Sequence, residues 1–141
     1  MKQRLNWSGE GRFEMGSGAD QYVTLVEVLE VIVSYEEFAR AVGDAVRRLE
    51  TEGVRELVAV HFYGHPGSTE VGAILTFSER ERMIEHIKMI SDWEEFEKFF
   101  ACVRPLDVRV YGRLSEEAEA WIGQFDVISK QFEHHVAGFL R

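Results

Sequence analysis

The chain has 141 residues, of which 45% are apolar and 29% are charged, and its formal net charge is -9. This length and apolar content suit a single domain over residues 1–141 with a core of its own. The acidic balance argues against a surface for nucleic acids or anionic membranes, because both partners require clustered Lys and Arg side chains.

The amino-terminal third is expected to form a hairpin, a strand and a helix. Glycines around residues 8–11 predict an N-terminal hairpin extension over residues 1–19. Residues 22–33 are dense in Val, Leu and Ile and predict a strand. Glu27 would share a face of that strand with its apolar neighbours, so we expect a bulge there or an exposed strand end.

A capping box marks the start of the first helix. Ser34 is followed three residues later by Glu37, apolar residues then recur at helical spacing, and Gly53 is expected to end the helix with a residue that can enter the left-handed region. Residues 57–62 are short and almost wholly apolar, which is typical of a strand covered on both faces in a parallel sheet.

Residues 68–90 allow two interpretations, and the choice between them decides the fold. In one, residues 69–80 form a helix and residues 86–90 a central strand, which gives βαβαβα order. In the other, residues 71–77 alternate as a strand that forms an antiparallel hairpin over residues 57–77, and a helix follows it. The local pattern slightly favours the hairpin.

The remaining elements are predicted from apolar periodicity. Ser91 or Asp92 is expected to cap a helix that Pro105 ends, residues 106–111 form a strand, and Ser115 opens another helix. The first of these helices should bury one broad apolar face and carry Cys102 in the core; that face consists of Trp93, Phe96, Phe99, Phe100 and Val103. The second should turn Ala118, Trp121, Ile122 and Phe125 inward.

The last residues are expected to add a C-terminal helical extension over residues 126–141. Its apolar positions exceed what a small sheet needs, so they could cover a neighbour in a homodimer. These positions include Phe132, Val136, Phe139 and Leu140.

Ser68 is the first candidate for a functional residue. It follows an apolar strand and a short His-Pro-Gly loop, where a helix would begin in the first interpretation. A Ser there can cap free backbone N–H groups, and the same groups would stabilise a phosphate on its oxygen. A plain helix cap is the simpler reading of the same position.

Residues 67–75 read Gly-Ser-Thr-Glu-Val-Gly-Ala-Ile-Leu. This stretch resembles the phosphorylation turn of the STAS (SpoIIAA-like) family of bacterial anti-sigma factor antagonists. The resemblance places Ser68 on the family's phosphorylatable Ser, Thr69 on the next hydroxyl residue and Gly72 on the second glycine. Glu70 replaces the first glycine. The resemblance implies an α/β fold with a mixed sheet of about five strands over residues 20–125, and it selects the βαβαβα order.

The same resemblance implies a non-catalytic regulatory module without a cofactor. We expect it to be cytoplasmic, because no apolar h-region follows the amino terminus and no apolar run is long enough to span a membrane. The partner of this module would be a protein, an anti-sigma or kinase-like regulator, that docks at the Ser68 region. The alternative is a small-ligand-binding domain whose pocket lies under the 61–68 loop, with His61, Tyr63 and His65 as candidate ligand residues. His61 and His65 could also join Glu56 or Glu70 around a metal, but their spacing across a loop is a weak signal and we expect no metal.

Overall fold

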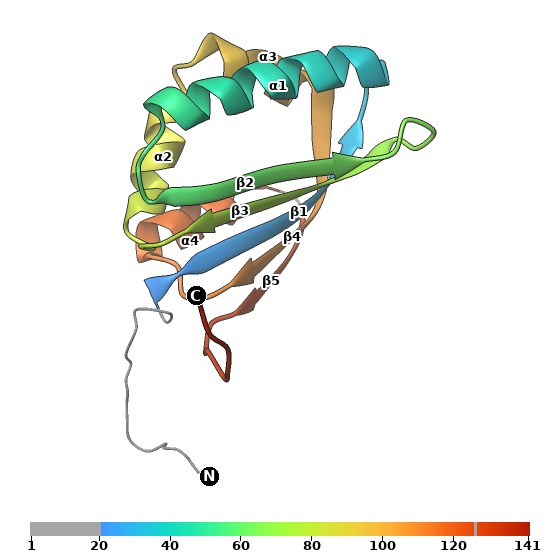
Figure 1. Ribbon diagram of the computed structural model, residues 1–141. Helices are drawn as coiled ribbons and strands as arrows, with labels where there is room; N and C mark the ends of the chain where they lie inside the picture. The colour runs from blue at the N-terminus through green and yellow to red at the C-terminus, as the bar shows by residue number, and fades with distance from the viewer. Residues whose placement is uncertain (1–20, 126) are drawn as a thin grey trace, which may run out of the picture.

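The computed structural model describes residues 21–125 and 127–141, which form five strands and four helices (Figure 1). In chain order they are β1 (Val23–Val31), α1 (Tyr35–Glu52), β2 (Leu57–Gly64), β3 (Glu70–Phe77), α2 (Arg82–Ile90), α3 (Glu94–Cys102), β4 (Val103–Tyr111), α4 (Glu116–Ile122) and β5 (Ile128–Phe132).

The five strands form one mixed sheet in the order β2-β3-β1-β4-β5. Neighbouring strands are antiparallel except for β4 and β5, which are parallel. The first four strands and the helices between them follow the βαββαβ pattern of ferredoxin-like domains, in which β3 lies between β1 and β2. The α4–β5 unit extends this pattern at the β4 edge.

The antiparallel hairpin over residues 57–77 is confirmed, and the helical interpretation of residues 69–80 is wrong. Residues 70–77 form β3, which pairs with β2, and the predicted central strand at residues 86–90 lies within helix α2. The alternation of β3 explains this outcome, because Val71, Ala73 and Phe77 are buried while the residues between them are partly exposed.

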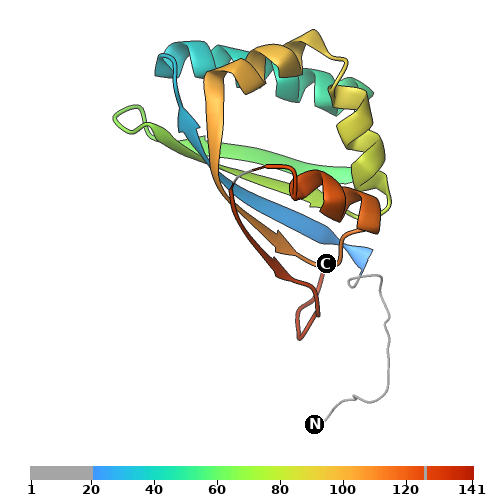
Figure 2. The same cartoon turned by 180° about the vertical axis from the view of Figure 1, so that it is seen from behind.

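All four helices pack on one face of the sheet. Helices α1 and α3 lie side by side above it, α2 stands at one end, and α4 lies near β1 and β4 (Figures 1 and 2). The buried residues under α1 and α3 form one cluster, which we call the upper cluster; it includes Leu29, Val31, Phe38, Val71, Phe96 and Phe99. Those near α2 and α4 form a second, the lower cluster, which includes Val23, Leu25, Phe77, Ile87, Val108 and Val110.

Two of the predicted helix starts, at Ser34 and Ser115, are confirmed by side-chain caps. The Ser34 hydroxyl accepts a hydrogen bond from the Glu37 backbone N–H at 3.1 Å, and the Ser115 hydroxyl accepts one from Ala118 at 3.2 Å. Gly53 ends α1, but its φ of -72° is not left-handed. Glycine is needed there because a Cβ would lie 2.5 Å from the Leu49 carbonyl oxygen.

Three predictions about strands and helix ends need correction. Strand β2 is not covered on both faces within a parallel sheet, because the helices lie on one face only, none of its residues is buried, and its neighbour β3 is antiparallel. Helix α3 ends at Cys102 and Pro105 lies inside β4, at the register shift where it pairs with Leu29. Trp93, and not Ser91 or Asp92, occupies the N-cap position of α3, and its side chain makes no capping hydrogen bond.

The C-terminal helical extension over residues 126–141 is also wrong, since residues 128–132 form strand β5. Beyond β5 three apolar side chains are largely exposed: Val136 at 93%, Phe139 at 75% and Leu140 at 57%. A homodimer stays a prediction. The hairpin expected over residues 1–19 lies outside the described residues.

The apolar face of α3 divides into a buried part and an exposed edge. Trp93, Phe96 and Phe99 are buried as predicted, and so is Cys102, but Phe100 is 50% exposed. None of the four helices in the described part of the chain has both the length and the apolar composition needed to cross a bilayer.

Candidate functional site

Two adjoining hollows lie between the sheet and the helices, where the upper and lower clusters do not fully meet. The first has a volume of about 100 Å³ and the second about 270 Å³. The two hollows are neighbouring parts of one cavity, because five residues line both: Leu25, Glu27, Phe99, Phe100 and Trp121.

Glu27 enters this cavity because the register of β1 is regular at its position. Strand β1 pairs with β3 without interruption, so Glu27 lies opposite Ala73 and shares the inward face with Leu25 and Leu29. The register shift in β1 occurs between Val28 and Leu29, on the β4 side only. The predicted bulge or exposed end at Glu27 is therefore wrong, and the carboxylate is directed toward the helices.

The Glu27 carboxylate has no partner of opposite charge in the cavity. Among the described residues, no side chain forms a hydrogen bond or ion pair with it, and Ala73 across the strand offers only a methyl group. Burial raises the pKa of Glu27 from 4.5 to about 7, because apolar surroundings disfavour the charged form. A carboxyl group with this pKa changes its protonation state near neutral pH.

His86 on α2 is the second ionisable group in the cavity. It lines the smaller hollow together with Glu27 and is only 4% exposed. Its ring meets Phe77 and Phe96 edge to face, with centroids 5.3 and 6.4 Å apart, and its Nδ1 has no hydrogen-bond partner in the described residues. Burial lowers the pKa of His86 from 6.5 to about 4, so the imidazole is neutral at neutral pH.

The side chains that line the larger hollow are apolar or aromatic apart from that of Glu27. The other lining residues are Leu25, Leu29, Phe99, Phe100, Val103, Pro105, Val108, Trp121, Ile122, Phe125 and Val127. Phe100 and Phe125 are 50% and 44% exposed, so they place its mouth between α3 and the end of α4. An engineered apolar cavity of about 150 Å³ can hold benzene, so about 270 Å³ has room for a larger ring system.

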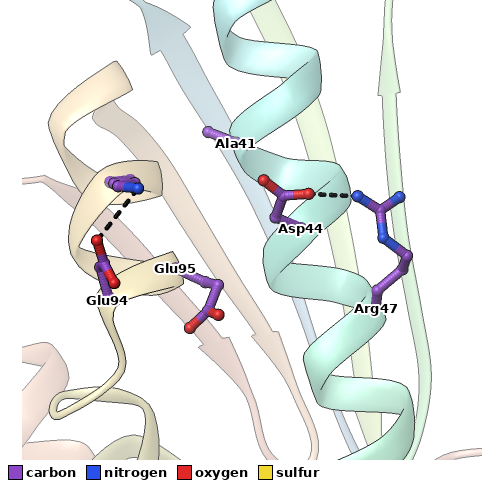
Figure 3. Close-up of a pocket in the computed structure, with 6 residues that line it drawn as sticks. Ala41, Asp44, Arg47, Glu94 and Glu95 are labelled. Atoms are coloured by element: carbon purple, nitrogen blue, oxygen red, sulfur yellow. Dashed lines mark hydrogen bonds and ion pairs between the residues drawn. The ribbon is translucent and has the colours of Figure 1, made fainter.

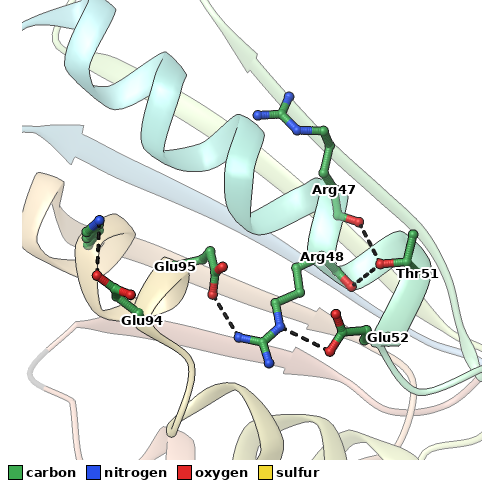
Figure 4. Close-up of polar contacts among 7 residues, drawn as sticks. Arg47, Arg48, Thr51, Glu52, Glu94 and Glu95 are labelled. Carbon is green, nitrogen blue, oxygen red and sulfur yellow. Dashed lines mark hydrogen bonds and ion pairs between the residues drawn. The ribbon is translucent and has the colours of Figure 1, made fainter.

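A polar network holds α3, and with it the aromatic roof of the cavity, against α1. The Arg48 guanidinium donates to Glu95 at 2.8 Å and to Glu52 at 3.2 Å (Figure 4). It also lies 4.2 Å from the centre of the Trp93 ring. The hydrogen bond from Arg48 lowers the pKa of Glu95. Because Trp93 and Glu95 begin the helix that carries Phe96, Phe99 and Phe100, this network positions the rings above Glu27.

A separate, polar hollow lies on the surface between α1 and α3, outside the internal cavity (Figure 3). Its charged groups are already paired: Arg47 with Asp44 on α1, Lys98 with Glu94 at 3.2 Å on α3, and Glu95 with Arg48 across the two helices. The side chains paired within one helix are more than half exposed, so water screens them. This hollow is a solvated seam between two helices and a weaker candidate than the internal cavity.

The residues predicted for a phosphorylation turn lie in and next to the β2–β3 hairpin loop, away from any helix start. The Ser68 hydroxyl accepts a hydrogen bond from the Glu70 backbone N–H at 3.1 Å, and the Thr69 carbonyl accepts one from Val31 at 2.7 Å. Glu70 begins β3, and Gly72 lies inside that strand. Phosphorylation of Ser68 stays a prediction, but the helix N-terminus from which it was argued is not there.

The three residues predicted for a ligand loop do not line the internal cavity. His61 and Tyr63 alternate with the inward-facing Phe62 and lie together on the opposite face of the sheet, with ring centroids 6.0 Å apart. His65 is exposed in the loop, where its Nδ1 accepts a hydrogen bond from Gly67. Within the described residues, no three His, Cys, Asp or Glu side chains come together as a metal site.

The sequence predicts some of the cavity residues but not the two most polar ones, Glu27 and His86. The helical periodicity correctly turned Trp121 and Phe99 inward. Glu27 does give a signal, as a lone acid on the inward face of a strand, but the sequence alone does not distinguish a cavity residue from a bulge there. The sequence does not mark His86 as a cavity residue, because the βαβαβα order places it in a strand, whereas it lies in helix α2.

No protein-family model matches this sequence, and a comparison with curated proteins finds no match. Comparison with solved structures does find similar folds. MupZ from Pseudomonas fluorescens matches with a TM-score of 0.62 and 14% identity, over 84% of this chain and 95% of that chain. SnoaB, a cofactor-independent oxygenase from Streptomyces nogalater, matches with a TM-score of 0.56 and 9% identity, over 67% of this chain and 95% of that chain.

These similarities show a shared fold and correct the predicted family. The chain has the fold of MupZ and SnoaB, so the resemblance to the STAS family is wrong. The predicted regulatory function as an anti-sigma factor antagonist rested on that resemblance and is wrong with it. The α/β class and the mixed sheet of five strands are confirmed.

Proposed function

We propose that this protein binds a small, largely apolar molecule in the cavity between the sheet and the helices. The ligand would place its ring system in the larger hollow and direct one hydrogen-bond donor to Glu27. The observation that carries the proposal is the unpartnered Glu27 carboxyl group in an otherwise apolar, aromatic-lined cavity. Small-molecule sites commonly combine apolar walls with a few polar groups that orient the ligand.

Stability supports a functional role for Glu27. A buried carboxyl group without a partner costs free energy, and an apolar residue of similar size would fill the position at no such cost. Perturbed ionisable groups in a cavity are typical of functional sites. One protein of the same fold, SnoaB, is a cofactor-independent oxygenase, so the fold is compatible with chemistry that needs no cofactor.

The proposal moves the small-ligand site from the 61–68 loop, where the sequence placed it, to the interior of the domain. Of the residues near that loop, Phe62 contributes to the smaller hollow, while His61, Tyr63 and His65 do not. A ligand held in the interior would be shielded from water by Phe99 and Phe100. This shielding strengthens any hydrogen bond made to Glu27.

Binding of β-naphthol, compared with β-methylnaphthalene, tests this function. The two probes differ in a hydroxyl and a methyl group, and binding is measured by tryptophan fluorescence and by the shift of the melting temperature. We expect β-naphthol to bind about tenfold more tightly, since a hydrogen bond to a charged group contributes about 1.5 to 3 kcal/mol.

Two variants locate the effect. Glu27→Leu should remove the preference for β-naphthol while β-methylnaphthalene still binds. Glu30→Gln alters a carboxylate on the same strand that faces the other side of the sheet and pairs with Arg104, so it should leave both affinities unchanged. The proposal fails if neither probe binds saturably, or if Glu27→Leu keeps the preference.

A further inference from the structure

The positions of the polar groups in the cavity suggest a reaction, beyond binding. Glu27 lines both hollows from the sheet, and His86 lines only the smaller one, from helix α2. Among the residues that the structure describes, no other ionisable side chain lines either hollow. A ligand whose rings fill the larger hollow would therefore have its polar end between a carboxyl group and an imidazole.

We propose that the cavity is a proton-transfer site, in which the Glu27 carboxylate removes a proton from a carbon next to the carbonyl group of a cyclic ketone. This inference rests on the proposed function, because the ketone must first occupy the cavity. The two groups come from opposite layers of the fold, so they can contact different atoms of one ligand.

The step is balanced without any further reactant. The C–H bond of the ketone breaks, its electron pair forms a carbon–carbon double bond, and the carbonyl π electrons move onto the oxygen, which becomes an enolate. The proton is held on Glu27 as a carboxylic acid. Return of that proton to the same carbon, or to a conjugated one, regenerates the carboxylate and yields the ketone or its isomer.

Each group suits its part of this step. A general base works best when its pKa is near the working pH, and burial brings the Glu27 carboxyl group into that range. His86 is neutral and its Nδ1 is unpartnered, so the imidazole can form a new hydrogen bond with the developing enolate oxygen. The apolar walls exclude water, which strengthens the stabilisation of that charge.

The size of the hollows sets the class of substrate. The smaller hollow, about 100 Å³, can take a carbonyl group beside His86, and the larger one, about 270 Å³, can take fused rings. The aromatic residues Phe99, Phe100 and Trp121 border both and would contact the ring faces. A ketone fused to an aromatic ring meets these requirements.

Exchange of the α-protons of β-tetralone in D₂O at neutral pD tests the inference. The loss of the α-proton signal is followed by NMR, with binding of the same ketone measured in parallel by tryptophan fluorescence. We expect exchange at least about 100-fold faster with wild-type protein than with Glu27→Gln, the usual size of a general-base effect. Glu30→Gln should exchange at the wild-type rate.

The pH profile and a second variant give further readouts. The exchange rate at saturating ketone should rise with pH and level off above about pH 7, as Glu27 loses its proton. His86→Phe should lower the maximal rate while β-tetralone still binds, because the hydrogen bond to oxygen is made mainly in the enolate.

The outcomes separate this inference from the proposed function. If β-tetralone binds saturably and Glu27→Gln exchanges as fast as wild type, the proton-transfer inference is wrong and the binding function stands. If neither β-tetralone nor β-naphthol binds, both are wrong. Circular dichroism of each variant confirms that the compared proteins are folded.

Discussion

Replacing Glu27 with Gln should stabilise the protein at alkaline pH, although the side chain lies on the inward face of the sheet. Folded Glu27 holds its proton up to about pH 7, whereas in the unfolded chain it loses the proton near its ordinary pKa of 4.5. Between these values the folded state binds more protons, so the contribution of Glu27 to stability falls as pH rises from 4.5 to about 7 and stays low above it. Glutamine has no charge to bury and escapes this loss.

The difference in pKa sets the magnitude. One unit of pKa corresponds to 1.36 kcal/mol, so a rise from 4.5 to about 7 corresponds to about 3 kcal/mol. We therefore expect Glu27→Gln to exceed the wild type by about 3 kcal/mol in free energy of unfolding at about pH 8, and to match it at about pH 4. His86, the other ionisable group that lines the cavity among the described residues, is present in both proteins, so its contribution cancels.

Urea denaturation followed by circular dichroism, at a series of pH values, measures this difference. Glu30→Gln is the matched control; it faces the opposite side of β1 and loses only an exposed pair with Arg104, so it should change stability by less than about 1 kcal/mol. The reasoning is refuted if Glu27→Gln is less stable than the wild type at about pH 8, or if the two curves stay parallel across the range.

Three further predictions follow from the packing, the second ionisable group and the caps. Phe99→Ala should lower the free energy of unfolding by about 3 to 5 kcal/mol, because Phe99 is buried. Phe100→Ala should lower it by only about 1 kcal/mol, because Phe100 is 50% exposed at the mouth of the cavity. Equal losses in chemical denaturation would contradict this assignment of the mouth. Because burial lowers the pKa of His86, the wild type loses stability as pH falls from 6.5 to about 4. His86→Phe should therefore be more stable than the wild type by about 3 kcal/mol near pH 4. Parallel plots of unfolding free energy against pH would argue against this. Ser34→Ala should cost about 1 kcal/mol through loss of the α1 cap, whereas Ser68→Ala, in an exposed loop, should change the melting temperature little; the reverse order would contradict the capping assignment.

Short-range signals were enough to predict the elements that depend on local chemistry. Ser34 and Ser115 cap the helices they were expected to cap, because a capping side chain bonds to backbone only two or three residues away. The alternation over residues 71–77 also indicated the correct strand. The family resemblance of a few residues around Ser68 favours the other order, and the observed β2–β3 hairpin agrees with the local pattern instead.

The site could not be predicted in the same way, because its residues meet only through tertiary packing. Glu27 on β1, His86 on α2 and Trp121 on α4 are far apart in the sequence, and no spacing connects them. In the sequence, Glu27 is an acid on an otherwise apolar face of the predicted strand. Its position follows from the unbroken pairing with β3, which places it opposite Ala73 and depends on the partner strand rather than on β1 itself.

An amide and side-chain chemical-shift titration with β-naphthol tests the central claim most directly, since it shows where a ligand binds. The account predicts saturable shifts at residues that line the internal cavity, with the largest at Glu27, at Phe99 and at the Trp121 indole N–H. Shifts confined to the 61–68 loop, with the cavity residues unchanged at saturation, would contradict it.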